Sequence, residues 1–250
     1  MNLLIDIGNT RIKWALQNGD DWTSGKPLIR GEKAFKDIAR PAWKELEVPE
    51  RVIISNVAGV EFEKSVRTWI KRRWKILPEF LHSQAEQCGV TNAYSKPERL
   101  GNDRWAALIA ARALCRGPAV ILSCGTAITI DALSGDGRHL GGLITPGIDL
   151  MISSVCARAS DVNIENGDSD EIALLASSTE SAVLGGSLYA AVSLLDRVSA
   201  DLSGELGGRV TVLLTGGDAE RLMPLLEAKT RYEPELVLKG LAVFSKEATV

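Results

Sequence analysis

The stretch Leu3–Thr10, which reads LLIDIGNT, is echoed later in the chain by VILSCGTA at Val120–Ala127. The two stretches align without a gap, and each is an apolar run that ends at a glycine close to a threonine before a second apolar run begins. This pattern predicts a strand, a tight turn and a second strand in both places. The repeat therefore predicts two similar half-molecules that face each other, with turns whose backbone N–H groups can meet phosphate oxygens.

The composition places limits on the class of protein. The chain has 250 residues, is 45% hydrophobic and 24% charged, and carries a net charge of −3. This length allows two domains of about 100–150 residues. The acidic balance argues against nucleic acid or an anionic membrane as a partner, because both bind basic faces. We expect no signal peptide, since no basic leader and apolar segment open the chain, and no apolar stretch reaches the ~20 residues that span a bilayer.

The four cysteines have no paired spacing. This usage favours reduced thiols in a cytoplasmic protein over a disulfide framework or a zinc site. They are Cys88, Cys115, Cys124 and Cys156.

Apolar periodicity predicts the elements of the first half. We expect a strand at Arg51–Val57 and helices at Glu63–Trp74 and Asp103–Cys115. The Arg-Gly-Pro sequence that follows the second helix marks a candidate boundary, which predicts one domain over residues 1–117 and another over 118–250.

The second half repeats the plan of the first. Strands that alternate with helices and are almost wholly apolar predict a mainly parallel sheet in each half. The expected elements are strands at Val120–Ser123, Ile128–Leu133 and Val210–Thr215, helices at Glu180–Val198, Ala219–Glu227 and Gly240–Lys246, and a Gly/Pro-rich loop at Gly141–Gly147.

A carboxylate, Asp6, closes the first apolar strand. In open α/β sheets ligands gather at the carboxyl ends of strands, and a glycine such as Gly8 lets a phosphate approach the backbone closely. Thr10 can donate a hydroxyl hydrogen bond, and Asp6 can hold Mg²⁺ directly or through water. Arg11 and Lys13 can offset phosphate charge. The alternative is a plain hairpin in which glycine and asparagine only supply turn geometry.

Two later glycine turns extend this pattern. Gly125-Thr126 matches the first turn and predicts a second phosphate contact, with a plain hairpin again as the alternative. Gly216–Asp218 follows a buried strand and opens a helix, whose N-terminus favours anions; a loop with Asp218 as the N-cap is the alternative. Neither the common P-loop signature nor Gly-x-Gly-x-x-Gly occurs, so a nucleotide site here is of another type.

The junction Gly101–Arg104 leads from a loop into a helix. Asp103 can act as the general base for a substrate hydroxyl, because phosphoryl transfer needs little more from the protein than an oriented attacking oxygen. Arg104 can then bind an anionic group of the substrate. The structural alternative is that Asp103 only caps its helix.

Several other features are expected to be inert. The basic run at Arg67–Lys75 contains two tryptophans, which we expect to face the core while the charges are solvated. His82 and His139 lack partners at metal-ligand spacing. Cys124 has no visible base and is interpreted as a small buried hydrophobic residue.

Taken together, these motifs resemble those of the type III pantothenate kinases, which phosphorylate pantothenate in the first step of coenzyme A synthesis. The resemblance is spread over nearly the whole chain, and its specificity lies in the order of motifs that are individually weak. The matching positions are Asp6-x-Gly8-Asn9-Thr10, Gly101-x-Asp103-Arg104, Gly125-Thr126-Ala127, Gly141-Gly142 with Pro146-Gly147, Thr179-Glu180-x-Ala182, Thr215-Gly216-Gly217-Asp218 and Gly240-Leu241.

The resemblance implies an α/β, duplicated ribonuclease-H-like (actin-like ATPase) fold of two similar domains with a cleft between them, as in sugar kinases and Hsp70 ATPase domains. It also implies a homodimer, ATP as co-substrate and Mg²⁺ near Asp6, with Asp103 taking the proton from the pantothenate hydroxyl. The implied ATP-binding residues are Asp6, Gly8, Asn9, Thr10, Arg11, Lys13, Gly125 and Thr126. The implied pantothenate-binding residues are Tyr94, Gly101, Asn102, Asp103, Arg104 and Thr179.

Ser123 departs from the family pattern. Many members carry an aspartate here that helps to bind K⁺ or NH₄⁺, and a neutral hydroxyl is a far weaker cation ligand than a carboxylate. We therefore expect little dependence on a monovalent cation.

Two other functions remain open from the sequence. One is a different kinase or phosphatase of the same superfamily, which fold alone does not separate from a pantothenate kinase. The other is a non-catalytic, nucleotide-dependent regulatory protein built on the same scaffold.

Overall fold

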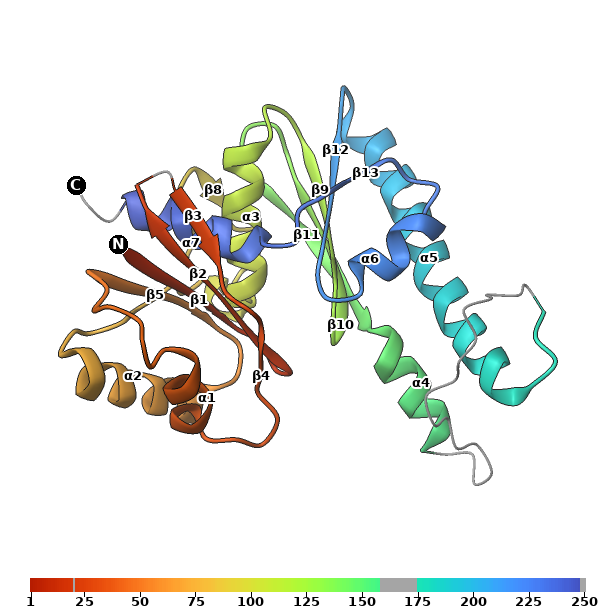
Figure 1. Ribbon diagram of the computed structural model, residues 1–250. Helices are drawn as coiled ribbons and strands as arrows, with labels where there is room; N and C mark the ends of the chain where they lie inside the picture. The colour runs from red at the N-terminus through yellow and green to blue at the C-terminus, as the bar shows by residue number, and fades with distance from the viewer. Residues whose placement is uncertain (20, 158–174, 248–250) are drawn as a thin grey trace. The chain divides into compact units, whose positions relative to one another are not determined.

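A computed structural model describes residues 1–19, 21–157 and 175–247 (Figure 1). The chain divides into two compact units. The first consists of residues 1–116, 137–139 and 235–250, and the second of residues 117–136 and 140–234. The chain first crosses between the units next to the predicted boundary at residue 117, but residues 235–247, which the prediction gave to the second domain, belong to the first unit.

The first unit is built on a sheet with the strand order β3-β2-β1-β5-β6, and β4 pairs with β2. Its central strand β1 runs antiparallel to β2 and parallel to β5. The strands are β1 (Asn2–Ile7), β2 (Arg11–Asn18), β3 (Asp21–Ser24), β4 (Leu28–Ile29), β5 (Arg51–Asn56) and β6 (Glu79–Phe80). A separate hairpin, β7 (Glu86–Gln87) with β8 (Val90–Thr91), belongs to the same unit.

The second unit repeats this topology. Its sheet has the order β11-β10-β9-β12-β13, in which β9 is antiparallel to β10 and parallel to β12. The strands are β9 (Ala119–Cys124), β10 (Ala127–Leu133), β11 (His139–Pro146), β12 (Thr211–Thr215) and β13 (Thr230–Tyr232). The central strands β1 and β9 are the two copies of the sequence repeat, so the predicted duplication is confirmed.

Both sheets are mixed, so the prediction of mainly parallel sheets is wrong. The reason is the short glycine turn after each central strand, which returns the chain beside that strand in the opposite sense. The later strands β5 and β12 return through longer connections and pair in parallel with the central strands, and β6 and β13 in turn pair in parallel with β5 and β12.

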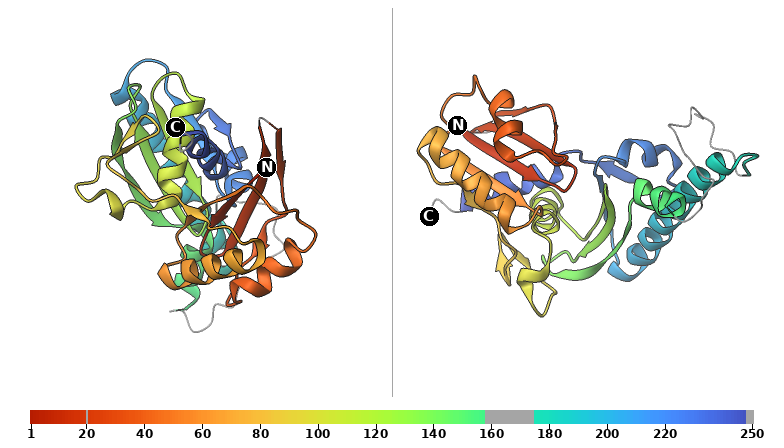
Figure 2. Two further views of the ribbon diagram at one scale, coloured as in Figure 1. Left: turned by 90° about the vertical axis from the view of Figure 1, so that its left-hand side faces the viewer. Right: turned by 90° about the horizontal axis from the view of Figure 1, so that it is seen from below.

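Helices cover the two faces of the first sheet (Figures 1 and 2). On one face α1 (Phe35–Ala42) and α2 (Val60–Trp74) pack on Leu3, Ile5 and Ile7. Because side chains alternate along a strand, Leu4 and Asp6 lie on the opposite face. There α3 (Asn102–Leu114) and α7 (Leu236–Glu247) contact β5, and α7 also contacts β1.

In the second unit one face of the sheet, which carries Val120, Leu122 and Cys124, packs against three helices. These are α4 (Ile148–Cys156), α5 (Thr179–Leu206) and α6 (Ala219–Leu222). Two 3₁₀ turns complete the fold, η1 (Pro97–Arg99) in the first unit and η2 (Met223–Leu225) in the second. Among the described residues, no helix combines the length and the apolar character that a membrane crossing demands.

Two expected elements differ from the structure. The stretch predicted as a loop at Gly141–Gly147 is mostly part of β11, an edge strand that tolerates Gly141 at φ 115° and a proline at its end. The predicted helix Ala219–Glu227 ends at Leu222 and continues as a 3₁₀ turn that contains Pro224, because a proline cannot extend an α-helix.

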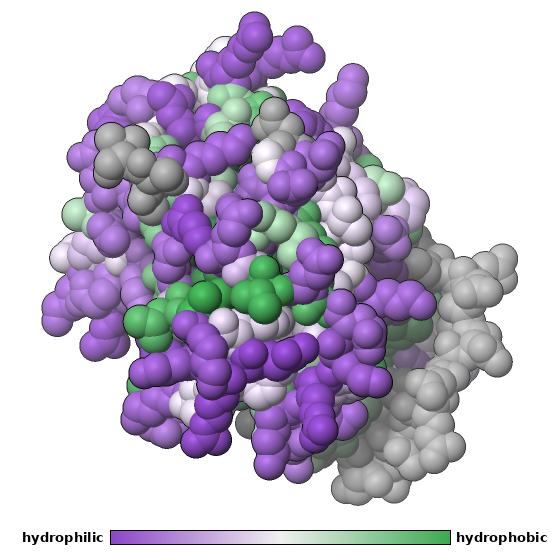
Figure 3. Space-filling model, turned by 60° about the vertical axis from the view of Figure 1, so that its left-hand side comes forward, coloured by the Kyte–Doolittle hydropathy of each residue, from purple (hydrophilic) through white to green (hydrophobic). Residues whose placement is uncertain are grey.

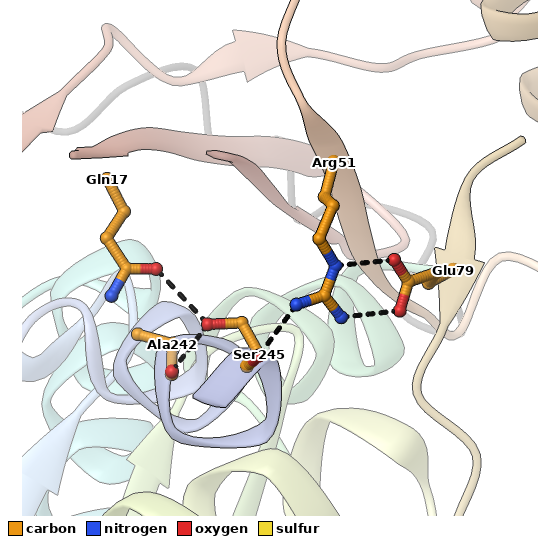
Figure 4. A network of polar contacts seen from close by, with 5 residues as sticks. All are labelled: Gln17, Arg51, Glu79, Ala242 and Ser245. Carbon is orange, nitrogen blue, oxygen red and sulfur yellow. Dashed lines mark hydrogen bonds and ion pairs between the residues drawn. The ribbon is translucent and has the colours of Figure 1, made fainter. Parts of the chain in front are cut away.

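The C-terminal helix α7 is held to the rest of the first unit by close packing and by a network of polar contacts. A Cβ on Gly240 would lie 1.9 Å from the carbonyl oxygen of Ala106, so the glycine lets α7 approach α3 closely. Figure 4 shows Arg51 paired with both carboxylate oxygens of Glu79 at 2.7 Å and donating to the Ser245 carbonyl at 2.7 Å. The Ser245 hydroxyl lies 3.3 Å from Gln17 Oε1. The network therefore ties α7 to three strands of the sheet.

Candidate functional site

The turn between β1 and β2 is tight, and hydrogen bonds hold it in place. The N–H of Gly8 donates to the Arg11 carbonyl at 3.0 Å, and a Cβ on Gly8 would lie only 3.1 Å from that oxygen. Arg30, which directly follows β4, holds the turn, because its backbone N–H donates to the Thr10 carbonyl and its side chain to the Asn9 carbonyl, both at 2.9 Å. Asn9, Thr10 and Arg11 are exposed, so this turn can meet a ligand from solvent.

Asp6 lies one residue before the end of β1, opposite Lys13 of β2. Its Oδ1 is excluded from solvent and accepts no hydrogen bond from the described residues. Burial raises the pKa of Asp6 to about 7; the negative charge of Asp103 raises it further, and the positive charge of Lys13 opposes the rise. The structure therefore brings the two predicted carboxylates close enough to interact within one unit.

The unpaired oxygen of Asp6 fits a magnesium ion, because Mg²⁺ prefers oxygen ligands and is bound in phosphoryl-transfer sites by one or two carboxylates, substrate phosphates and water. Across the described ranges, no set of three or more His, Cys, Asp or Glu side chains is arranged as metal ligands.

The start of α3 positions Asp103. Gly101 is the N-cap and Asp103 the second helical residue, so the alternative in which Asp103 serves only as the N-cap is wrong. Asp103 Oδ1 accepts the N–H of Arg104 at 2.8 Å, and a Cβ on Gly101 would lie 2.7 Å from that oxygen. A larger residue at 101 would therefore displace the carboxylate.

Asn102 anchors this helix start to the sheet. Its Nδ2 donates to the Asn56 carbonyl at the end of β5 at 3.1 Å, and its Oδ1 accepts the N–H of Ser83 at 3.1 Å. Ser83 in turn donates its hydroxyl to the Leu100 carbonyl at 2.8 Å. Asn102 was expected to bind substrate, and these contacts give its side chain a role in holding the Asp103 loop.

Arg104, Tyr94 and His139 form a stack beside the same helix. Nη1 of Arg104 donates to the Tyr94 hydroxyl at 3.0 Å, and the guanidinium lies 5.8 Å from the centre of that ring. The His139 ring stacks on Tyr94 with centroids 6.0 Å apart. Arg104 and His139 are both buried, so the guanidinium is held in one place as a fixed positive charge.

In the second unit three predicted segments meet at the β9–β10 turn. The N–H of Gly125 donates to the Ala127 carbonyl at 3.1 Å, which closes the turn. The Gly147 N–H donates to the Thr126 carbonyl at 3.0 Å, and the Asp218 N–H donates to the Cys124 carbonyl at 3.0 Å. A Cβ on Gly125 would meet no atom within 4 Å, so the space next to this glycine is open.

Glycines make this convergence possible. Gly216 adopts φ 108°, and a Cβ there would lie 2.0 Å from the Cys124 carbonyl oxygen. A Cβ on Gly147 would lie 2.0 Å from the Gly125 carbonyl oxygen. Thr179, the remaining predicted substrate residue, is exposed as the first residue of α5, after Ser178, whose side chain caps that helix.

Of the features expected to be inert, Cys124 is a core residue and His82 stacks on a neighbouring ring, whereas His139 lies in the stack on Tyr94. Cys124 is fully buried, and burial, together with the charge of Asp218, raises the pKa of its thiol to about 12, so the thiol stays protonated at neutral pH. All four cysteines lie among the described residues, and none of them forms a disulfide there. The His82 ring stacks on Phe80.

The basic run on α2 is also as expected. Trp69 and Trp74 pack in or against the core, and the basic side chains between them are exposed. Figure 3 shows mostly hydrophilic side chains on the side of the molecule where α2 lies. A surface hollow of about 390 Å³ in this region contains none of the predicted site residues; it is lined by Arg40, Lys44, Trp69, Arg72 and Arg73.

Sequence reasoning missed the contribution of β5. Ser55 and Asn56 end this strand beside Asp6 and Ile7 of β1. Asn56 holds the Asn102 side chain through its carbonyl and, through its own side chain, bonds Gly59 and Ala58. The available signal was a pair of polar residues at the carboxyl end of a solidly apolar strand.

Comparison with solved structures defines the class of fold. A Campylobacter jejuni protein named for the Baf family of transcriptional activators is 21% identical, with a TM-score of 0.61 over 99% of this chain and 100% of that one. A glucokinase from an Antarctic psychrotroph is 13% identical, with a TM-score of 0.52 over 98% of each chain. The chain therefore has the duplicated ribonuclease-H-like fold of the actin-like ATPases and sugar kinases.

Comparison of sequences narrows the class to a family. The model of the type III pantothenate kinase family matches residues 2–201. A type III pantothenate kinase of Nitrosococcus oceani is 43% identical over 100% of this chain and 95% of that protein. One of Nitrosospira multiformis is 38% identical over 99% of this chain and 92% of that protein. The chain belongs to the type III pantothenate kinase family.

Proposed function

We propose that this protein transfers the γ-phosphoryl group of ATP to the hydroxyl of pantothenate, giving 4′-phosphopantothenate in the first step of coenzyme A biosynthesis. The observation that carries the proposal is that Asp6 and Asp103 of the first unit lie near enough to interact electrostatically, beside the Gly8 turn and in a chain of this family. One carboxylate suits a metal ion, and the other lies at a helix start held by Asn102.

The two glycine turns are the proposed phosphate contacts. In the first unit Gly8, Asn9 and Thr10 would offer N–H and hydroxyl groups, and the exposed Arg11 with Lys13 would add positive charge. In the second unit Gly125 and Thr126 would do the same at the open space next to Gly125. Preorganised donors of this kind stabilise the charge that develops on the transferred group.

Asp6 would hold magnesium, directly or through water. When bound, the ion neutralises charge on the phosphates during transfer. The support for this assignment is the solvent-excluded Oδ1 without a hydrogen-bond partner.

Asp103 would accept the proton of the pantothenate hydroxyl as that oxygen attacks phosphorus. The fixed guanidinium of Arg104 would bind the pantothenate carboxylate, and Tyr94 would keep Arg104 in place. Gly101 and Asn102 shape and anchor this loop, and Thr179 would add a hydroxyl contact.

A homodimer is part of the proposal. Large apolar side chains are exposed on β11, α4 and α5 of the second unit, among them Leu143, Ile144, Leu150, Val155 and Tyr189. Exposed apolar surface is typical of protein interfaces. In the proposed homodimer, a second copy of the chain would cover these side chains.

Little dependence on K⁺ is expected from Ser123. This residue occupies in β9 the place that Asp6 occupies in β1, one residue before the strand ends, and offers only a neutral hydroxyl. Replacing K⁺ and NH₄⁺ by a bulky organic cation should change the rate by less than about threefold, which is under 1 kcal/mol. The measurement is ADP formation at matched ionic strength. A large loss of rate would show that other groups build the cation site.

The function is tested by ADP release from the purified protein with ATP and Mg²⁺, with and without pantothenate. We expect release to depend on pantothenate and not on glucose. Release that depends on a sugar would indicate another kinase of the superfamily. ATP binding without turnover of pantothenate would indicate a regulatory protein.

A further inference from the structure

Two buried oxygens without hydrogen-bond partners lie on neighbouring strands at one end of the first sheet. They are Oδ1 of Asp6 and Oγ of Ser55, and neither finds a donor or acceptor among the described residues. Ser55 is fully buried. The two residues are direct partners in the parallel pairing of β1 and β5, where neighbouring strands lie about 4.8 Å apart.

Their side chains are on the same face of the sheet. The flanking residues Ile5 and Ile7 of β1 and Ile54 of β5 belong to the core under α1 and α2. Because successive side chains alternate, Asp6 and Ser55 both point to the other face. On that face α3 contacts β5, and Asp103 in the first turn of α3 acts electrostatically on Asp6.

An unpaired hydroxyl in this position has a cost. A buried polar group without a partner destabilises a protein, so such groups are rare unless water, an ion or a ligand completes them. A serine hydroxyl both donates and accepts, and magnesium keeps several of its waters when it is bound by one or two carboxylates. These properties match the two unpaired oxygens.

We propose that Ser55 is a positioning residue of the magnesium site, and that its hydroxyl and the Asp6 carboxylate together hold a water molecule of the ion. The proposal rests on the proposed function, in which Asp6 holds magnesium. It assigns to β5 a part in the site that the turn motifs do not include.

The test is the change Ser55→Ala in the full chain, with Mn²⁺ as the probe. Mn²⁺ binding in the presence of ADP is followed by electron paramagnetic resonance, so no turnover is needed. We expect the Kd for Mn²⁺ to rise about five- to tenfold, in line with the loss of one ordinary hydrogen bond. The melting temperature of the metal-free protein should stay the same or rise, because the change removes an unpaired buried hydroxyl.

Ser199→Ala is the matched control. Its hydroxyl is also buried and unpartnered but lies on α5 in the second unit. We expect the same effect on melting and no change in Mn²⁺ affinity. Ser55→Thr keeps the hydroxyl and should retain most of the affinity.

Two results overturn the proposal in distinguishable ways. If Asp6→Asn weakens Mn²⁺ binding but Ser55→Ala leaves it unchanged and lowers the melting temperature, the Ser55 hydroxyl is a structural group and the proposed function stands. If Asp6→Asn also leaves Mn²⁺ binding unchanged, the metal assignment of the proposed function fails together with this inference.

Discussion

Replacing Asp103 by asparagine should lower kcat about 10²–10⁴-fold and leave the KM for ATP near its original value. Loss of a general base typically has this effect. Asparagine keeps the shape of the side chain, and its oxygen can still accept the N–H of Arg104 that Asp103 accepts at 2.8 Å. The start of α3 should therefore persist while proton transfer is lost. Steady-state kinetics with both substrates varied measures the effect.

A matched control for this change is Glu61→Gln. Glu61 is also the second residue of a helix that follows a glycine N-cap, but it is exposed on α2. The control should keep the kcat of the unmodified protein. Near-normal turnover of an Asp103→Asn enzyme that binds both substrates would contradict the assignment of the base.

Replacing Asp6 by asparagine should lower kcat/KM for MgATP about 10²–10³-fold, the range for loss of one preorganised electrostatic contact. The neutral amide is a poor ligand for Mg²⁺, although it fills the same space. Kinetics at several Mg²⁺ concentrations measures this change, and excess Mg²⁺ should restore only part of the rate. An unchanged Mg²⁺ requirement would contradict the role of Asp6.

The same variant should change how the stability of the metal-free protein depends on pH. The pKa of Asp6 is about 7 in the folded chain against 3.8 for the unperturbed group, so the folded state holds this proton more tightly. The contribution of protonated Asp6 to the stability of the folded state is fully present below about pH 4. It is lost as the pH rises through 7. The melting temperature of Asp6→Asn relative to the unmodified protein should therefore increase from pH 5 to pH 8. A difference that does not vary with pH would show that Asp6 is not buried as described.

The repeat in the sequence predicted the most informative part of the fold. Apolar runs around Asp6 and Ser123 fixed β1 and β9, and the glycine turns predicted the strands that follow. The direction in which the strands pair was harder to predict. A strand made almost wholly of apolar residues indicates burial on both faces, but it does not distinguish a parallel from a mixed sheet. The edge strand β11 was not predicted, because it contains Gly141 and Pro146, residues that are more typical of loops. Helix α7 joins the first unit through the long-range contact of Gly240 with Ala106, and no local pattern reveals that.

A site residue was predictable where its side chain suits the chemistry and its place in the sequence marks the end of a strand or a turn. Asp6 and the Gly8 turn met this condition. Asn102 and Ser55 did not, since their roles depend on partners distant in sequence: Asn102 bonds Asn56 and Ser83, and Ser55 lies beside Asp6. Their importance arises only when β1, β5 and α3 pack together.

The central claim is that Asp103 receives the proton of pantothenate beside a metal ion held at Asp6. A crystal structure with Mg²⁺, a non-hydrolysable ATP analogue and pantothenate tests it most directly. The account predicts the pantothenate hydroxyl within about 2.6–3.2 Å of an Asp103 carboxylate oxygen, with Mg²⁺ bound to Asp6 directly or through one water. A hydroxyl that instead contacts another residue, with Asp103 bonded only to the backbone of its own helix, would contradict it.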